Sequence, residues 1–271
     1  EVKALLKLIK CEFWKLKRKR FVQLVLMASF LFPAPLTFIV YRLNSVQGKY
    51  STKEAAFDAL WQSVMGFGML LLLPCVLGIL AAQLFFMERD NDTYKNLRTI
   101  PVTSTEMVAA KYAVLLLLSI LFCISSTAAS ILCGSICFDV TNIIYKLLFS
   151  VLDGIMIALS ALPLVLLIVF FSKSYIFSVM LCVFYSVFNL LSTFTIASLP
   201  KILVFLLPTP SIMLWSSVQI AEHMSMEDAA DLQNFVELGL IPSTAQLFFT
   251  LGAIGIVSVL LAIYLYKERS E

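Results

Sequence analysis

Residues 21–40 read FVQLVLMASFLFPAPLTFIV and contain no charged side chain. An α-helix rises about 1.5 Å per residue, so a helix of this length spans the roughly 30 Å of hydrocarbon in a bilayer. We therefore predict that these residues cross a membrane once. Pro33 and Pro35 are expected to kink the outer half of this crossing, because proline removes a helical hydrogen bond.

The composition of the whole chain points to the same solvent. Of 271 residues, 61% are hydrophobic and 14% are charged, whereas soluble domains carry about 45–50% apolar and about 25% charged residues. A water-soluble particle of this size cannot hide so much apolar surface. The composition excludes a soluble enzyme, a disordered chain and a nucleic-acid-binding module, and the net charge of +3 is too small to indicate a polyanionic partner.

Five further apolar stretches are long enough to cross a bilayer. They cover residues 60–87, 108–137, 143–171, 175–196 and 244–266. The six stretches predict an all-α integral membrane protein with a single transmembrane domain over residues 1–271. An even number of crossings leaves both chain ends on the same side.

Lysine and arginine predict which side that is. Of the 20 Lys and Arg residues, fifteen lie on the side that holds both ends and five on the opposite side. Cytoplasmic loops carry the excess of these residues. We therefore expect both termini in the cytoplasm.

Residues 1–20 form an amphipathic segment ahead of the first crossing. Leu5, Ile9 and Phe13 recur at helical spacing, and lysines fill the other side. This pattern predicts a helix that lies in the headgroup plane. The segment ends in a basic cluster expected to contact anionic lipid, made of Lys15, Lys17, Arg18, Lys19 and Arg20.

Residues 197–243 are apolar at first but are interrupted by Pro200, Pro208 and Pro210. We interpret them as a re-entrant or interfacial hairpin on the outer side, which is tolerated only where it packs against protein. Acidic residues follow, and no Lys or Arg separates them: Glu222, Glu227, Asp228, Asp231 and Glu237. They either attract a cationic substrate or simply keep a loop in water.

Catalytic motifs are missing from the sequence. It contains no Walker A motif, no H-E-x-x-H and no G-x-S-x-G. His223 is the sole histidine and the cysteines form no CxxC pair, so few ligands are available for a metal. We expect neither enzymatic activity nor a bound metal or cofactor in this chain.

Polar side chains inside the crossings offer a candidate path. Asp153 lies within an apolar stretch, where a charge costs about 2.5–3.5 kcal/mol at the bilayer centre. It either lines a translocation route or pairs across a helix interface, or it sits shallow, is partly hydrated and pairs with Lys146. Ser186, Asn189 and Thr193 form a stripe on one helix face, which either bonds neighbouring helices or wets a cavity wall.

The charged segment 88–107 lies between the second and third crossings. Asp92 or Thr93 can cap a short helix that Pro101 stops, and Ser104 or Thr105 can cap the next helix. A short rigid cytoplasmic helix at this point would receive force from a soluble motor. A solvated loop is the alternative.

The stretch ERDNDTYKNLRTIPVTSTEMVAAK, residues 88–111, resembles the coupling segment of type-2 ABC exporter permeases. The opening LLKLIKCEFWKLKRKR resembles the connecting helix of that family, and FFSKSYIFSV resembles its short inner turn. The likeness is greatest to the permeases of lantibiotic self-protection and peptide-antibiotic resistance in Gram-positive bacteria. Asn91 and Asp92 stand where a glycine often precedes the threonine in that family.

This resemblance implies a permease of the bacterial cytoplasmic membrane that pairs with itself or a sister permease above two copies of a separate ATPase. That ATPase would bind ATP and Mg²⁺, and the substrate would be a lantibiotic or similar cationic peptide. The residues implied to contact the ATPase are Glu88, Arg89, Asp92, Thr93, Tyr94, Lys95 and Leu97.

Two other functions fit the same sequence. One is an ABC permease for another substrate, such as a bacitracin-like drug, sodium or a lipid-linked glycan. The other is a membrane anchor or sensor that binds a soluble partner without transport.

Overall fold

The computed structural model describes residues 2–42, 50, 52–90, 103–171, 175–223 and 229–270, and every element in this part of the chain is helical. Six helical stretches are long and apolar enough to cross a membrane, as predicted: Phe21–Arg42, Lys53–Phe86, Ser104–Gly134, Ile143–Phe170, Tyr175–Phe194 and Thr244–Lys267. The protein is therefore a multi-pass membrane protein.

Three of these stretches are built from more than one element. The first consists of α2 (Phe21–Ser29) and α3 (Pro33–Arg42), and the helix is interrupted just ahead of Pro33. The fourth consists of α9 (Ile143–Ser160) and α10 (Leu162–Phe170), a break that our prediction of one continuous crossing missed. Pro163 explains it, because proline lacks the N–H that would continue the helical hydrogen bonds.

The second stretch begins earlier than predicted and changes its winding. It starts with α5 (Lys53–Ser63), continues through the π-helix η1 (Val64–Leu72) and ends with α6 (Leu73–Asp90). Thr52 caps α5, since its side chain accepts a hydrogen bond from the Ala55 N–H. The early start places Asp58 inside α5, ahead of the predicted start of the crossing at residue 60.

The third stretch is one long helix, α8 (Ser104–Gly134). Its N-cap is Thr103, not Ser104 or Thr105 as predicted. Thr103 accepts from the Glu106 N–H, and the Glu106 carboxylate accepts from the Thr103 N–H at 2.8 Å. This capping box satisfies two backbone donors at once and fixes where α8 leaves the 91–102 segment.

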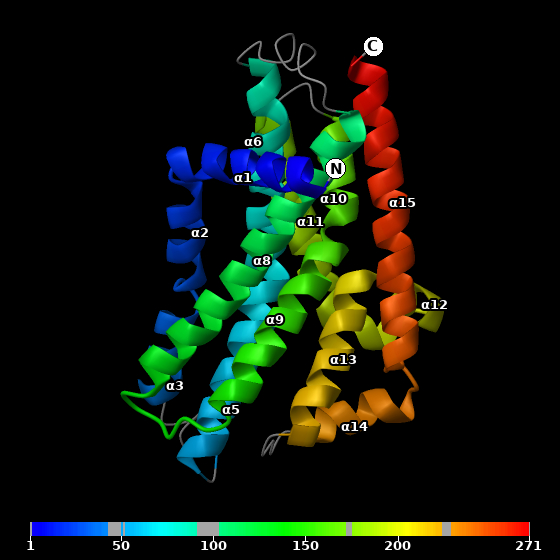
Figure 1. Cartoon of the computed structure of the whole chain (residues 1–271). Helices are drawn as coiled ribbons and strands as arrows, with labels where there is room; N and C mark the ends of the chain where they lie inside the picture. Colours follow the sequence, from blue (N-terminus) through cyan, green and yellow to red (C-terminus); the bar gives the residue numbers. More distant parts are fainter. Residues whose placement is uncertain are drawn as a thin grey trace.

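The α8–α9 hairpin forms the centre of the bundle (Figure 1). The two helices touch at Gly154, where an added Cβ would lie 3.0 Å from the Ile120 Cα. The Ser119 hydroxyl donates to the Gly154 carbonyl at 2.7 Å. Small residues allow such close backbone approach, which drives helix association where no water can be expelled.

The N-terminal helix α1 (Val2–Arg18) runs across one end of the bundle (Figure 1). Leu16 and Glu12 on its inner side are buried, whereas Leu6 and Trp14 are more than half exposed. Within the basic cluster, Lys15 is partly buried and Lys17, Arg18, Lys19 and Arg20 are exposed. Their contact with lipid stays a prediction.

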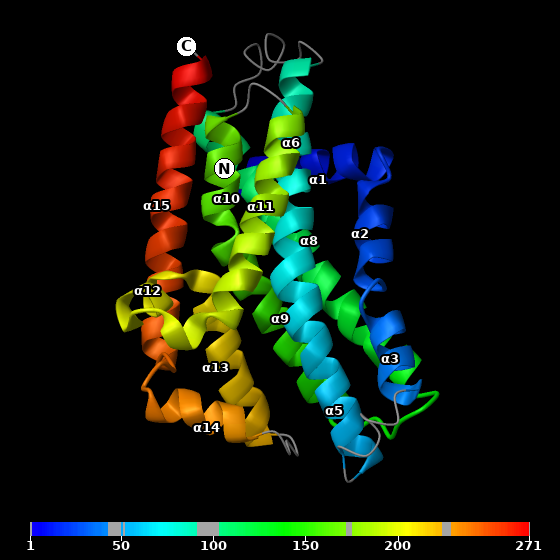
Figure 2. The same ribbon diagram turned by 180° about the vertical axis from the view of Figure 1, so that it is seen from behind.

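The proline-rich region before the last crossing is also helical. It contains η2 (Ile196–Ser198), α12 (Lys201–Leu206), α13 (Pro208–His223) and α14 (Ala229–Glu237). The prolines stand at helix starts, where a missing N–H costs nothing. α12 and α13 pack against α15 (Thr244–Ser270), and α14 lies at the end opposite α1 (Figure 2). The re-entrant position of this region in a bilayer stays a prediction.

Candidate functional site

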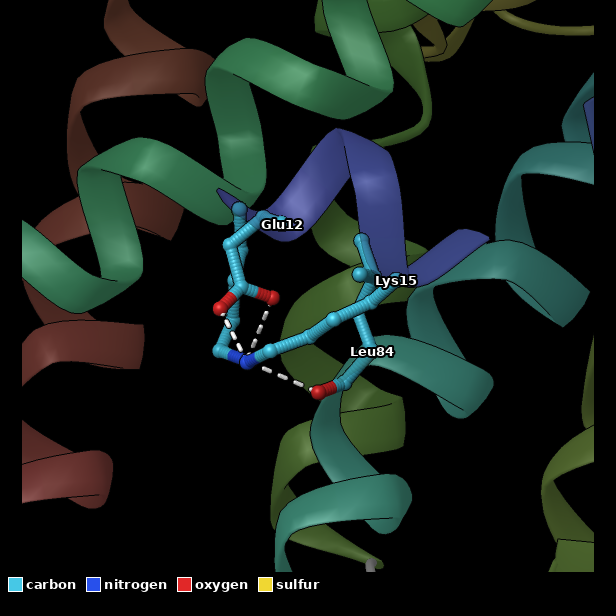
Figure 3. Close-up of polar contacts among 4 residues, drawn as sticks. Glu12, Lys15 and Leu84 are labelled. Carbon is cyan, nitrogen blue, oxygen red and sulfur yellow. Dashed lines mark hydrogen bonds and ion pairs between the residues drawn. The ribbon is translucent and has the colours of Figure 1, made fainter. Parts of the chain in front are cut away.

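A buried ion pair joins α1 to the two helices that flank the charged segment. The Lys111 ammonium on α8 lies 3.5 Å from a Glu12 carboxylate oxygen and donates to the Leu84 carbonyl of α6 at 2.8 Å. Lys15, one turn along α1, bonds the other Glu12 oxygen. Figure 3 shows Glu12 and Lys15 of α1 above the Leu84 carbonyl. We call Glu12, Lys111 and the Leu84 carbonyl the inner junction.

The inner junction is fully enclosed by protein. Glu12 is 1% exposed and Lys111 is 0% exposed, and the Lys111 ammonium also lies 5.3 Å from the centre of the Phe85 ring. A charge buried in a low-dielectric interior is costly unless it is paired and hydrogen-bonded. Burial of each charge is favourable only while its partner is in place. The pairing therefore joins α1, α6 and α8 at one buried point.

Sequence reasoning missed this junction. The distribution of basic residues places Lys111 on the cytoplasmic side, and Glu12 lies in the amphipathic segment of residues 1–20. The sequence analysis does not pair these two residues. The available signal was position: Glu12 interrupts the apolar face of α1, between Ile9 and Leu16, and Lys111 follows a run of small apolar residues. A charge on the packed face of a helix indicates a partner of opposite sign on a neighbouring element.

The predicted coupling residues lie close to this junction in the chain. Glu88 and Arg89 belong to the last turn of α6, and only their backbone is described. The others lie outside the described residues: Asp92, Thr93, Tyr94, Lys95 and Leu97. Leu84 is one helical turn before Glu88, and Lys111 is two turns after the Thr103 cap. The inner junction therefore lies near the end of α6 and the start of α8, the helices on either side of residues 91–102.

A second buried ion pair lies toward the opposite end of the bundle. The Lys146 ammonium on α9 contacts an Asp58 carboxylate oxygen of α5 at 2.7 Å and donates to the Thr141 carbonyl at 2.7 Å. It also lies 4.7 Å from the centre of the Phe57 ring and 5.9 Å from that of Trp61. The suggested pairing of Lys146 with Asp153 is wrong, because Lys146 turns toward α5. Asp58, which lies outside the predicted crossing over residues 60–87, is also buried, at 3% exposed.

A cavity of about 240 Å³ lies between α5, η1, α9, α11 (Tyr175–Phe194) and α13. Its walls are mainly apolar, with aromatic side chains from Phe67 and Phe194. The π-helix forms one wall, and Gly66 within it has no atom within 4 Å of the place that a Cβ would take. The polar side chains that line the cavity are Gln62, Ser63, Asp153, Thr193, Ser216 and Ser217.

Only some residues of the predicted polar path line this cavity. Asp153 lines it and accepts a hydrogen bond from the Ser216 hydroxyl at 3.4 Å, while Thr193 lines the same cavity from α11. Ser186 and Asn189 are buried on α11, 2% and 1% exposed, and are not part of the wall. Whether these two residues bond helices or contact substrate stays a prediction.

Three of the predicted outer acids, Glu222, Asp231 and Glu237, lie in the described residues, at the end of the bundle opposite α1. Glu222 lies in the last turn of α13 and Glu237 is the last residue of α14, and both are exposed. Asp231 lies on α14 with only its backbone described, and Glu227 and Asp228 lie outside the described residues. α13 carries both Glu222 and Ser216, so one helix runs from the acidic end to the cavity.

The family described as ABC-2 family transporter protein matches residues 8–189, from α1 into α11. The chain belongs to this family. No curated protein matches it. It is therefore the membrane subunit of an ABC transporter, a permease without catalysis of its own, and its family implies an ABC ATPase as partner.

Within the described ranges, no group of three or more His, Cys, Asp and Glu side chains is placed to hold an ion.

Proposed function

We propose that this permease works in an ATP-driven exporter that expels a lantibiotic or a similar cationic antimicrobial peptide from the cell membrane, and thereby protects the cell. The family match supports a type-2 permease driven by a separate ATPase. The observation that supports the proposed mechanism is the inner junction, which joins α1 to α6 and α8. These two helices lie on either side of residues 91–102, within the stretch that resembles a coupling segment.

ATP-driven closure of the two ATPase subunits would push on the 91–102 segment and on α1. The Glu12–Lys111 pair holds α1 and α8 together at 3.5 Å, and Lys111 holds the α6 backbone at 2.8 Å. Buried, hydrogen-bonded charges resist separation, because an unpaired charge in the interior destabilises the protein by several kcal/mol. The push would therefore move α1, α6 and α8 as one unit and tilt the crossings around the cavity.

The cationic substrate is supported by charge at the other end. Glu222 and Glu237 are exposed opposite α1, and Asp153 lines the cavity that α13 connects to that end. A cluster of acids raises the local concentration of a cation and speeds its encounter with the protein. A sister permease or a second copy of this chain would complete the membrane part of the exporter.

The test is co-purification of the permease with its ATPase, followed by reconstitution into vesicles. We expect the permease to raise the rate of ATP hydrolysis and to export a fluorescently labelled lantibiotic only when ATP is present. ATP hydrolysis without lantibiotic export would contradict the proposed substrate and favour another ABC substrate. Failure to bind any ATPase would contradict the exporter and favour an anchor or sensor.

The inner junction is tested in the same vesicles with Glu12→Gln. Glutamine keeps the shape and one acceptor but removes the charge that Lys111 faces. We expect the complex to form and hydrolyse ATP while export falls about tenfold or more, which corresponds to about 1.4 kcal/mol. Glu54→Gln, an exposed acid on α5, is the matched control. Equal export by Glu12→Gln and Glu54→Gln would remove the junction from the mechanism.

A further inference from the structure

Asp153 is a buried carboxylate with no cationic partner among the described residues. It is 4% exposed, and its hydrogen bond from the Ser216 hydroxyl is long, at 3.4 Å. Lys146 precedes it by two turns on α9 but is held by Asp58 and the Thr141 carbonyl at 2.7 Å each. The carboxylate therefore faces the cavity with no basic side chain of the described residues to neutralise it.

The other buried carboxylates of the described chain show what this position lacks. Glu12 faces Lys111 and Lys15, and Asp58 faces Lys146. Burial of a charge without a partner is strongly unfavourable, so native proteins pair such groups or use them for function. Asp153 differs from these two also in its surroundings, because open space of about 240 Å³ lies in front of it. A cation in the cavity supplies the missing partner.

The lining indicates which kind of cation fits. A bare metal ion needs about six oxygen ligands that converge on one point, whereas the cavity offers one carboxylate among mainly apolar walls. An ammonium group needs fewer acceptors. Ser63 and Thr193 donate their hydroxyl protons to the Ala59 and Leu190 carbonyls, so their oxygens remain able to accept.

The apolar part of the lining fits the carbon chain of such a cation. Met65 and Ile212 provide aliphatic walls, and Phe67 and Phe194 provide rings that attract a cation within about 6 Å. The volume exceeds the roughly 150 Å³ of a cavity that holds one benzene molecule, so a four- or five-carbon amine fits. Gly66 widens the cavity on the η1 side.

We propose that this cavity binds the ammonium end of an alkylammonium group, such as a lysine side chain of an amphiphilic peptide, with Asp153 as its counter-ion. The proposal deepens the proposed function, because it names the part of the substrate that the permease recognises. Ser216 orients the carboxylate from α13, and the apolar walls hold the methylene chain. A neutral molecule of the same shape leaves the carboxylate unpaired and binds weakly.

The experiment measures binding of a dansyl-labelled pentylammonium ion to the full-length permease in nanodiscs of uncharged lipid. We expect saturable binding that butylammonium displaces and butanol does not. Asp153→Asn, which keeps the shape and removes the charge, should weaken binding at least about tenfold. Asp139→Asn is the matched control, because Asp139 is exposed in the turn between α8 and α9. Equal binding by the two variants, or equal competition by butanol, would overturn the proposal.

A second variant keeps the test decisive if Asp153→Asn fails to fold. Gly66→Leu leaves Asp153 intact and fills the open space in front of Gly66, and it should abolish probe binding. Unchanged binding would overturn the proposed site. The assay needs no ATP and no ATPase, so a loss of peptide export in the reconstituted complex and a loss of ammonium binding are separate failures.

Discussion

Two buried aspartates of this permease, Asp58 and Asp153, have opposite surroundings. Asp58 touches Lys146 at 2.7 Å in a packed region next to Phe57 and Trp61. Asp153 has no cation among the described residues and faces a cavity of about 240 Å³. The helix α9 carries Lys146 and Asp153 two turns apart, yet the lysine turns to the neighbouring helix. Asp153 therefore faces the cavity with no cation from its own helix.

This contrast separates a structural charge, Asp58, from a charge that we propose to be functional, Asp153. Lys146 belongs to a network that closes the bundle around α5: the Trp61 indole donates to Thr127 at 3.2 Å, and Thr127 bonds Ser150 on α9. Gly134 lets Phe57 pack against α8, since an added Cβ would lie 2.4 Å from that ring. Asp153 instead lines an open cavity of about 240 Å³. The packed region therefore fixes the helices, and the cavity is left open between them.

The largest expected effect comes from breaking the packed pair. Lys146→Met leaves Asp58 buried without a partner and should destabilise the permease by about 3–5 kcal/mol. Loss of folded protein during heating in detergent, followed by size-exclusion chromatography, measures this. Lys53→Met, an exposed lysine on the same side of the bundle, should change little.

The double variant Lys146→Met with Asp58→Asn tests whether the unpaired carboxylate causes the loss of stability. It removes both charges and should recover much of the lost stability, because the unpaired carboxylate is gone. If Lys146→Met alone were as stable as Lys53→Met, the pair would not hold the bundle together.

Two glycines give the next effect in size. Gly154→Ala places a Cβ 3.0 Å from the Ile120 backbone, which cannot move like a flexible side chain, and should cost about 1–3 kcal/mol. Gly66→Ala meets no atom within 4 Å and should change stability by less than about 1 kcal/mol. The same heating assay compares them. Equal losses would mean that the space beside Gly66 is not open.

The smallest effect is expected at the edge of the cavity. Ser216→Ala removes the 3.4 Å hydrogen bond to Asp153 but leaves the charge, so ammonium binding should weaken by about twofold to tenfold. Titration of the dansyl-labelled probe measures it, with Ser198→Ala on the exposed η2 turn as control. A loss as large as that of Asp153→Asn would assign the main contact to the hydroxyl.

The sequence predicted the elements well because membrane crossings depend on local composition. All six crossings and the helical nature of residues 2–18 follow from apolar runs and helical spacing, which need no knowledge of the partners. The π-helix η1 and the break at Pro163 were missed because they alter winding within an apolar run without changing its hydropathy.

The site was harder to predict because ion pairs depend on which helices meet. Glu12 and Lys111 are 99 residues apart and Asp58 and Lys146 are 88 apart, so no local pattern joins them. Asp153 was found from the sequence, since an acid in an apolar helix stands out alone. Its cavity was not, because the walls come from four separate parts of the chain.

In the proposed mechanism the α1 end of the permease receives ATP-driven force in the cytoplasm, and the acidic end faces outside. Single cysteines placed by Lys10→Cys on α1 and Glu237→Cys on α14, in a chain with its six native cysteines replaced, test it with a membrane-impermeant maleimide. We predict that Glu237→Cys reacts in intact cells and that Lys10→Cys reacts only after the membrane is opened. Labelling of Lys10→Cys in intact cells would contradict the account.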